Sequence, residues 1–150
     1  MNRYTIITPT TYDGAHHQAI AHLLSQLSSR AITFTEDDYR QQLASPHSPL
    51  FLLFDGNAVI GMLTVGTYLT PTGSKAWIED VVVDNAYRGQ GLGKMLVTHA
   101  IDYCKRQHIA TLMLTSKPQR IAANALYQSL HFERKETNVY KMEMGADSAK

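Results

Sequence analysis

The stretch from Trp77 to Lys94, WIEDVVVDNAYRGQGLGK, constrains the fold more than any other part of the chain. A run of apolar and β-branched residues ends at Val83, and a short polar turn follows. The segment Arg88–Lys94 is rich in glycine, and apolar residues then recur at helical spacing. This pattern predicts a strand that feeds a glycine-rich loop, which opens a long helix.

The glycine-rich loop is suited to an external anion. The first turn of a helix carries unpaired backbone N–H groups and a partial positive charge, which a Ser, Thr, Asp or Asn cap usually satisfies. No such cap lies near this helix start; the glycines leave the backbone accessible, and Arg88 and Lys94 add positive charge. A phosphate or pyrophosphate would satisfy all of these groups. The alternative is a tight strand–helix turn whose N–H groups bind water.

The rest of the chain predicts an α/β fold with α+β character and a mixed sheet. Runs 50–55 and 58–69 are separated by Gly56-Asn57, which favours an antiparallel hairpin that 75–83 continues. The strand 111–116 follows a helix and should pair in parallel with 75–83. Predicted strands are 3–8, 50–55, 58–69, 75–83, 111–116, 131–136 and 138–144, and predicted helices run from 11 or 13 to 27, 35–44, 91–107 and 119–130.

The predicted order of elements is β-α-α-β-β-β-α-β-α-β-β. Because 150 residues is an ordinary length for one domain and no linker or repeat appears, residues 1–150 are expected to form a single domain. Ligands tend to bind at the carboxyl ends of parallel strands that lead into helices, which Val83 and Ser116 mark. Residues 145–150 are expected to form a frayed tail.

Composition excludes several functional classes. The formal net charge of +1 gives no basic footprint for nucleic acid or for an acidic membrane surface. No apolar run is long enough to span a bilayer, and the N-terminal sequence MNRYTIITPTTYDG is too polar for a signal peptide. The single cysteine, Cys104, has no intrachain partner, which is typical of a reducing compartment. We therefore expect a soluble, cytoplasmic protein.

Two motifs carry a family resemblance. Arg88-Gly89-Gln90-Gly91-Leu92-Gly93 resembles the (Arg/Gln)-x-x-Gly-x-(Gly/Ala) signature of the GNAT superfamily, the acyl-CoA-dependent N-acyltransferases. Asn124-Ala125-Leu126-Tyr127, followed by Leu130-His131-Phe132, resembles the family's Asn-x-x-Tyr…Gly-Phe segment. His131 departs from the usual glycine at a turn that favours positive φ, which histidine tolerates better than bulky residues do.

The resemblance covers nearly the whole chain. It implies a GNAT-type mixed central sheet of about six to seven strands flanked by four helices. The strand 78–83, together with the loop, is also locally similar to glucosamine-phosphate N-acetyltransferases. Family members often have a bulge in this strand that splays the two parallel strands, although the uniform valine run does not reveal one.

The resemblance implies acetyl-CoA as the donor. Backbone N–H groups of the loop would hold its pyrophosphate, Arg88 would add charge or pair with local backbone, and the pantetheine amides would pair with the strand edge. Asn124 would contact the pantetheine, and Tyr127 would donate a proton or hydrogen bond to the leaving thiolate. The implied acetyl-CoA-binding residues are Val81, Val82, Val83, Arg88, Gly89, Gln90, Gly91, Leu92, Gly93, Lys94, Asn124 and Tyr127. The alternative is that Tyr127 is a half-buried core aromatic and Asn124 a solvated helix residue.

A catalytic base would assist the acceptor. An alkylamine is neutral in roughly one molecule in a thousand near pH 7, and only the neutral amine attacks. Glu79 and Asp80 are the candidate bases, with Tyr127 as the catalytic acid. In a regular strand the two carboxylates point to opposite faces, so only one should face the ligand, and Glu79 is favoured. The alternative is that both are merely solvated.

Acceptor-binding residues are weakly indicated. Thr115 and Ser116 follow the second parallel strand, Arg30 lies in the region between the first two helices, and Glu79 precedes the loop. Tyr39, Lys117, Asn138 and Tyr140 are further candidates, and each of these residues taken singly is more typical of a structural role. The histidines 16, 17 and 22 lack the spacing and partners of a metal site, so we expect surface histidines and no metal.

The sequence therefore favours an N-acetyltransferase that moves acetyl from acetyl-CoA directly to a primary amine of a small molecule. One alternative is an enzyme that acetylates a protein or peptide amine. Another is a non-catalytic module that senses acyl-CoA. A dinucleotide-binding protein fits less well, because no acidic ribose partner lies at the required spacing. Family members often form dimers, so a homodimer is compatible with the sequence, and the acceptor amine is left open.

Overall fold

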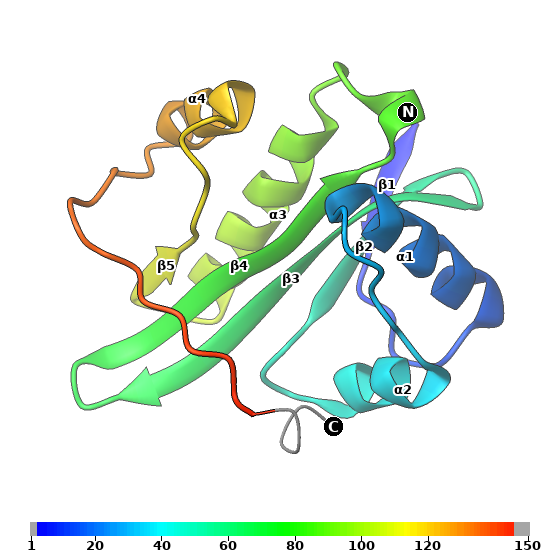
Figure 1. The fold of residues 1–150 in the computed structure, drawn as a ribbon, viewed down its shortest axis with the longest axis horizontal. Helices are drawn as coiled ribbons and strands as arrows, with labels where there is room; N and C mark the ends of the chain where they lie inside the picture. The colour runs from blue at the N-terminus through cyan, green and yellow to red at the C-terminus, as the bar shows by residue number, and fades with distance from the viewer. Residues whose placement is uncertain (1–2, 146–150) are drawn as a thin grey trace. The chain divides into compact units, whose positions relative to one another are not determined.

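The computed structural model describes residues 3–145 (Figure 1). The chain divides after Thr115 into two compact units, Met1–Thr115 and Ser116–Lys150, which are considered separately. The prediction of a single domain therefore stays a prediction. The elements are β1 (Tyr4–Ile7), α1 (Gly14–Leu27), α2 (Glu36–Ala44), β2 (Leu50–Asp55), β3 (Ala58–Thr70), β4 (Gly73–Val83), the 3₁₀ turn η1 (Asn85–Tyr87), α3 (Leu92–Arg106), β5 (Thr111–Met113) and α4 (Ile121–Ser129).

The first unit contains one mixed sheet of order β1-β2-β3-β4-β5. Strands β1 to β4 pair antiparallel in sequence order, and β5 pairs in parallel with β4. Helices α1 and α2 cover one face of this sheet and α3 covers the other (Figure 1). The predicted hairpin, meander and parallel pair are confirmed, so the chain has the mixed sheet that the sequence predicts.

Local capping explains where the first two helices begin. The Asp13 carboxylate accepts hydrogen bonds from the N–H groups of Ala15 (2.8 Å) and His16 (3.1 Å), which fixes the start of α1. Thr35 and Asp38 form a capping box: the Thr35 hydroxyl accepts from Asp38 N–H at 3.0 Å, and the Asp38 carboxylate accepts from Thr35 N–H at 2.9 Å. Both starts agree with the sequence-based prediction.

The core lies on both faces of β2 and β3. Five consecutive residues of β2, 50–54, are buried, as expected for a strand covered by helices on both sides. On the α1–α2 face, Leu23 and Tyr39 are fully buried against the sheet. On the α3 face, an added Cβ at Gly61 would lie 3.3 Å from Leu96, so helix and sheet meet closely there. Cys104 is buried in α3.

In the second unit, α4 forms but the two closing strands do not. Within the described residues, the predicted strands 131–136 and 138–144 do not form. The sheet of the first unit therefore has five strands instead of the expected six to seven. The cause is the absence of a ladder partner, because alternation of apolar residues specifies a face and does not supply the neighbouring strand. Of the predicted tail, Gly145 is described, and residues 146–150 lie outside the described part.

Candidate functional site

A β-bulge interrupts β4 in the middle of the predicted site. Three consecutive residues of β3, 62–64, face four consecutive residues of β4, 79–82. Two residues of β4, Asp80 and Val81, therefore oppose the single residue Leu63. Asp80 has φ 53°, in the left-handed region that aspartate enters more readily than most residues. The sequence does not reveal this bulge, since the run Val81–Val83 is uniformly valine.

Because of the extra residue, the side chains of β4 after the bulge lie on the face opposite to the one they would occupy in a regular strand. Val82 lies four positions after Ile78, so a regular strand would place both side chains on one face. Here Val82 packs in the core cluster beneath α1 and α2, while Ile78 lies opposite Val65. Glu79 is paired with Thr64, whose hydroxyl accepts a hydrogen bond from Gln42 of α2 at 3.0 Å. Glu79 is therefore on the face that α1 and α2 cover.

The outer edge of β4 is open beyond Trp77. Within residues 3–145, β5 pairs with β4 only along residues 75–77. At the end of β4, Asp84 donates its N–H to Ile60 O at 2.8 Å, so alternation turns the N–H and C=O of Val83 to the opposite edge. Arg88 Nε makes a long contact of 3.5 Å with Val83 O from that side. The edge of β4 thus has backbone groups available to an extended ligand.

The glycine-rich loop starts α3 without a side-chain cap. Gly89 and Gly91 have φ of 80° and 76°, and Gly91 is the N-cap residue of α3. An added Cβ at either glycine would meet nothing within 4 Å, so the backbone conformation and not crowding requires glycine. The first turn of α3 contains no acidic residue, and Arg88 and Lys94 are exposed. The helix N-terminus is therefore free of the groups that usually satisfy its N–H donors.

Side chains far away in the sequence hold this loop. Tyr4 donates its hydroxyl to Gln90 Oε1 at 2.6 Å, and Tyr87 donates its hydroxyl to Asp55 Oδ2 at 3.0 Å. Arg3 binds both oxygens of Asp55 at 3.0 and 2.7 Å. These hydrogen bonds hold the pKa of Asp55 below its usual range, and the bond from Arg3 has the largest effect. Sequence reasoning missed all of these contacts, because no local pattern reports a pair separated by 32 or more residues.

The two candidate bases are both perturbed toward protonation. Partial desolvation raises the pKa of Glu79, and the neighbouring Asp80 charge raises it further. Desolvation also raises the pKa of Asp80. Both residues are exposed overall, so water can reach the carboxylates. A carboxylate with a raised pKa is a stronger proton acceptor than an ordinary one, which suits a general base.

In the second unit, a Schellman motif fixes the end of α4 next to Tyr127. His131 N–H donates to Gln128 O at 3.0 Å, Phe132 N–H donates to Tyr127 O at 3.0 Å, and the Tyr127 and Phe132 rings meet edge to face at 6.0 Å. His131 has φ 71°, which confirms the predicted positive φ. Desolvation raises the pKa of the Tyr127 phenol. Asn124 is not a freely solvated residue, because its amide donates to the carbonyls of Lys117 and Arg120 at 2.9 Å each.

The remaining predicted residues divide between exposed and structural positions. Arg30 and Thr115 are exposed, and Ser116 is half-buried. Tyr39 is fully buried among aromatic rings, so its role is structural. Among the described residues, no group of three or more His, Cys, Asp or Glu side chains is placed to hold a metal ion. None of the helices in that part of the chain combines the length and apolar character needed to cross a membrane.

The expectation of surface histidines is wrong for two of the three. His17 is half-buried because it bridges the Tyr12 hydroxyl (2.8 Å) and the Phe34 carbonyl (2.7 Å). His16 is half-buried with its ring edge-on to Phe54 at 5.3 Å. His22 is exposed, as expected. The spacing of histidines along a helix does not indicate the aromatic rings against which His16 and His17 pack.

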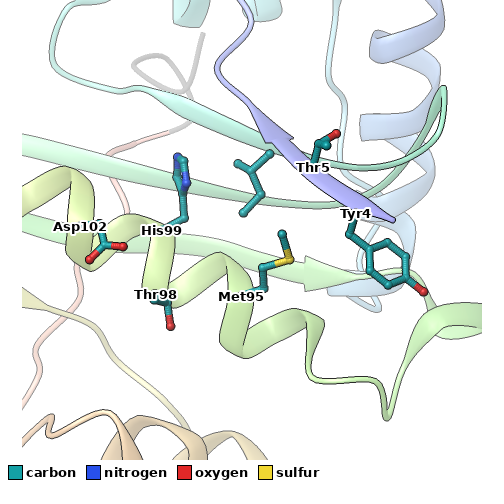
Figure 2. Close-up of a pocket in the computed structure, with 7 residues that line it drawn as sticks. Tyr4, Thr5, Met95, Thr98, His99 and Asp102 are labelled. Atoms are coloured by element: carbon teal, nitrogen blue, oxygen red, sulfur yellow. The ribbon is translucent and has the colours of Figure 1, made fainter. Parts of the chain in front are cut away.

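A separate groove lies beside β1 and α3 (Figure 2). It has a volume of about 470 Å³ and contains none of the sequence-predicted site residues. His99 lines it with its ring edge-on to Phe51 at 4.6 Å, and desolvation lowers the pKa of this histidine. The lining residues are Tyr4, Thr5, Ile6, Met95, Thr98, His99 and Asp102.

The sequence pattern of the acetyltransferase (GNAT) family matches residues 18–132. The chain belongs to this family. The match extends across the division between the two compact units and includes both motifs on which the resemblance rests. The structure-based comparison agrees with it: glucosamine-6-phosphate N-acetyltransferase from Arabidopsis thaliana has a TM-score of 0.78 at 18% identity, covering 94% of this GNAT chain and 99% of that chain, which shows the fold.

Two relatives by sequence differ in how much they align. The ribosomal protein bS18-alanine N-acetyltransferase of Escherichia coli K12 is 41% identical over 58 residues, which is 39% of each chain. The GNAT chain thus spans about two fifths of that relative's length. N-alpha-acetyltransferase RimI of Mycobacterium tuberculosis H37Rv is 26% identical over 127 residues, covering 81% of this chain and 77% of that one.

Proposed function

We propose that this chain transfers the acetyl group of acetyl-CoA to a primary amine. The observation that carries the proposal is the continuity of one segment: the bulged strand β4, with an open edge, runs directly into an uncapped, glycine-rich helix start. The open edge suits the amides of pantetheine, and the helix start suits a pyrophosphate. Acetyl-CoA contains both groups in the order in which the segment presents their partners.

The donor would lie along this segment. The N–H groups of Gln90 to Lys94 would hold the pyrophosphate, and Val83 would pair with a pantetheine amide. Binding the amide requires Arg88 to leave its long contact with Val83 O, which is weak at 3.5 Å and easily exchanged. Arg88 is then available to the phosphates. The side-chain amide of Asn124 donates both of its hydrogen bonds, to Lys117 O and Arg120 O, from the nitrogen, which leaves its side-chain oxygen for a ligand.

The reaction needs no covalent enzyme intermediate. The neutral amine attacks the thioester carbonyl, a C–N bond forms and the C–S bond breaks. The nitrogen loses one proton to Glu79, directly or through water. The leaving thiolate takes one proton from the Tyr127 phenol, and solvent then reprotonates the phenolate. Glu79 is the better candidate base than Asp80, because it lies on the face covered by α1 and α2, and the acceptor candidate Arg30 lies in the segment that joins these helices.

Two acceptor classes merit direct comparison. A small-molecule amine is the acceptor that the sequence analysis favours. The alpha-amine of a protein N-terminus is favoured by a separate observation, since both sequence relatives described above bear the names of enzymes that acetylate such amines. The alignment with the first of these covers only 39% of each chain, so most of the two chains is not compared by it.

A thiol-release assay with acetyl-CoA tests the proposal. The acceptor panel contains glucosamine 6-phosphate, an aminoglycoside and a short peptide beginning with alanine, each paired with its N-acetylated form as the matched control. We expect release above background with at least one free amine and with none of the acetylated forms. Binding of CoA by calorimetry without release from any amine would instead support an acyl-CoA sensor, and no CoA binding would exclude both functions.

A further inference from the structure

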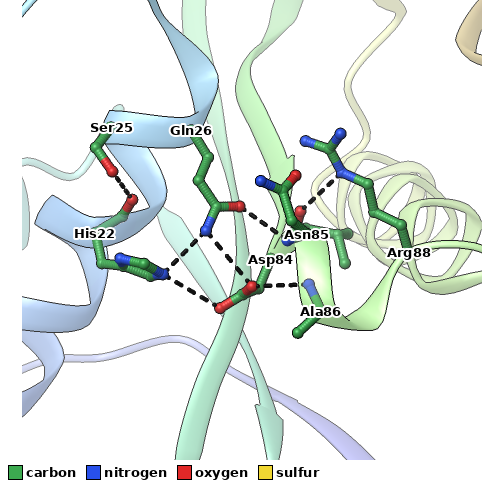
Figure 3. Close-up of polar contacts among 8 residues, drawn as sticks. His22, Ser25, Gln26, Asp84, Asn85, Ala86 and Arg88 are labelled. Carbon is green, nitrogen blue, oxygen red and sulfur yellow. Dashed lines mark hydrogen bonds and ion pairs between the residues drawn. The ribbon is translucent and has the colours of Figure 1, made fainter.

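The last turns of α1 contact the residues that lead into the glycine-rich loop (Figure 3). Asn85 donates its backbone N–H to Gln26 Oε1 at 2.8 Å. Gln26 Nε2 lies 3.5 Å from Asp84 Oδ1, and His22 Nε2 lies 3.5 Å from Asp84 Oδ2. Gln26 and Asn85 lie 59 positions apart in the sequence. A helix on one face of the sheet thus holds the start of the loop from the side.

The turn itself is already ordered at Asp84. The N–H of Asp84 donates to Ile60 O at 2.8 Å, and its carboxylate accepts from Ala86 N–H at 3.0 Å. Beyond this turn, Gly89 and Gly91 both have positive φ, and glycine has wide conformational freedom. The hydrogen bond between Gln26 and Asn85 therefore fixes the chain at the point where the ordered end of β4 gives way to the glycine-rich loop. Without it, the loop would have to be ordered by its ligand, and binding would be weaker.

We propose that Gln26 is a positioning residue for the loop that holds the pyrophosphate of acetyl-CoA. The inference rests on the proposed function. Gln26 itself would not touch the donor: it fixes Asn85, which begins η1, and η1 leads into the glycines. Its effect should therefore be confined to donors that carry a pyrophosphate.

The chemistry of the amide supports this assignment. A backbone N–H can only donate, so the oxygen of the Gln26 amide must face Asn85. The amide nitrogen then faces Asp84 and His22 Nε2, the latter at 2.9 Å. One planar group thus meets an obligate donor on one side and acceptors on the other. Methionine has a similar length and no acceptor of comparable strength, which makes Gln26→Met a sharp substitution.

A second variant removes the same hydrogen bond from the loop side. Asn85→Pro deletes the N–H that Gln26 accepts and leaves α1 unchanged. Proline suits the first position of a helical turn, and Asp84 before it is extended with φ −50° and ψ 136°, as a residue preceding proline prefers. Gln18→Met is the matched control, because Gln18 is an exposed glutamine on the same helix.

The test measures CoA affinity by calorimetry and turnover with two donors, acetyl-CoA and S-acetylpantetheine, which lacks the pyrophosphate. We expect Gln26→Met and Asn85→Pro to weaken CoA binding about fivefold, the size of one net hydrogen bond. The KM for acetyl-CoA should rise to a similar extent, and kcat/KM with S-acetylpantetheine should be unchanged. Gln18→Met should match the wild type throughout.

Unchanged CoA affinity in both variants, or an equal loss with S-acetylpantetheine, would overturn the positioning role. The first result would mean that the loop does not depend on Gln26, and the second that the substitution damages the fold in general. Failure of the proposed function looks different, because the wild-type chain itself would then bind no CoA or release no thiol.

Discussion

The carbonyl oxygen of Val82 lies 3.1 Å from the point where a side chain on Gly61 would begin. Leu53 and Leu96 lie 3.2 and 3.3 Å from the same point. Because the nearest atom belongs to the backbone of the bulged strand, it cannot move aside as a side chain would. We expect Gly61→Ala to lower the free energy of unfolding by about 1–3 kcal/mol, measured by denaturant titration.

The matched control for this prediction is Gly66→Ala on the same strand, where an added Cβ would meet nothing within 4 Å. This variant should be neutral, or more stable by about 0.5–1 kcal/mol, because alanine restricts the unfolded chain more than glycine does. Equal destabilisation by the two substitutions would show that the approach of Gly61 to β4 is not what requires glycine.

His131 holds a backbone conformation that favours glycine. Its φ of 71° closes the Schellman motif at the end of α4. The left-handed conformation costs a residue with a Cβ about 1–2 kcal/mol, part of which glycine loses again in the unfolded state. We therefore expect His131→Gly to stabilise the chain by about 0.5–1 kcal/mol and His131→Val to destabilise it, as measured by chemical denaturation. A less stable His131→Gly variant would contradict the strain argument.

Tyr127→Phe isolates the phenol from the ring. The edge-to-face contact with Phe132 survives the change, so the fold should be intact. If the phenol protonates the leaving thiolate, kcat should fall at least about 100-fold while the affinity for CoA stays within about twofold. Tyr68→Phe provides the control, since Tyr68 is 44% exposed and is not among the predicted site residues. A kcat equal to that of the wild type would remove the acid role from Tyr127.

Glu79 should set the acid limb of the pH–rate profile. Its raised pKa means that the folded chain holds this proton more tightly than the unfolded chain does. Stability therefore falls as pH rises through that window, whereas activity falls as pH drops through it, because only the carboxylate accepts a proton.

The corresponding variant, Glu79→Gln, should lose about 100-fold in kcat/KM near neutral pH and gain slightly in thermal stability. Its residual activity should lack the acid limb. Glu133→Gln, at another exposed position, should retain the wild-type profile. An unchanged acid limb in Glu79→Gln would assign the base to another group, with Asp80 as the next to test.

Local signals in the sequence predicted the parts of this fold that depend on short-range chemistry. Asp13 and Thr35 begin their helices because a carboxylate or hydroxyl at that position binds the first free N–H groups. The positive φ at His131 follows from its place one residue beyond a helix C-cap. These features need no knowledge of the rest of the chain.

Features that depend on a partner strand or a distant side chain were not predictable. The bulge at Asp80 is a mismatch between two strands, and valine repeats look alike in or out of register. The prediction of the two closing strands was wrong for a related reason. Alternating apolar residues around Tyr140 indicate which side chains would share a face, but they do not indicate a strand with which this segment could pair. The Gln26–Asn85 and Tyr87–Asp55 bonds join segments that only the fold brings together.

The open edge of β4 has a consequence for handling the protein. Backbone N–H and C=O groups that can receive pantetheine can equally receive an extended peptide from another molecule, and exposed strand edges are common starting points for aggregation. A bound donor would occupy that edge. Preparations without acetyl-CoA should therefore precipitate sooner on storage or heating than those with it, and the donor would act as a shield against self-association as well as a reactant.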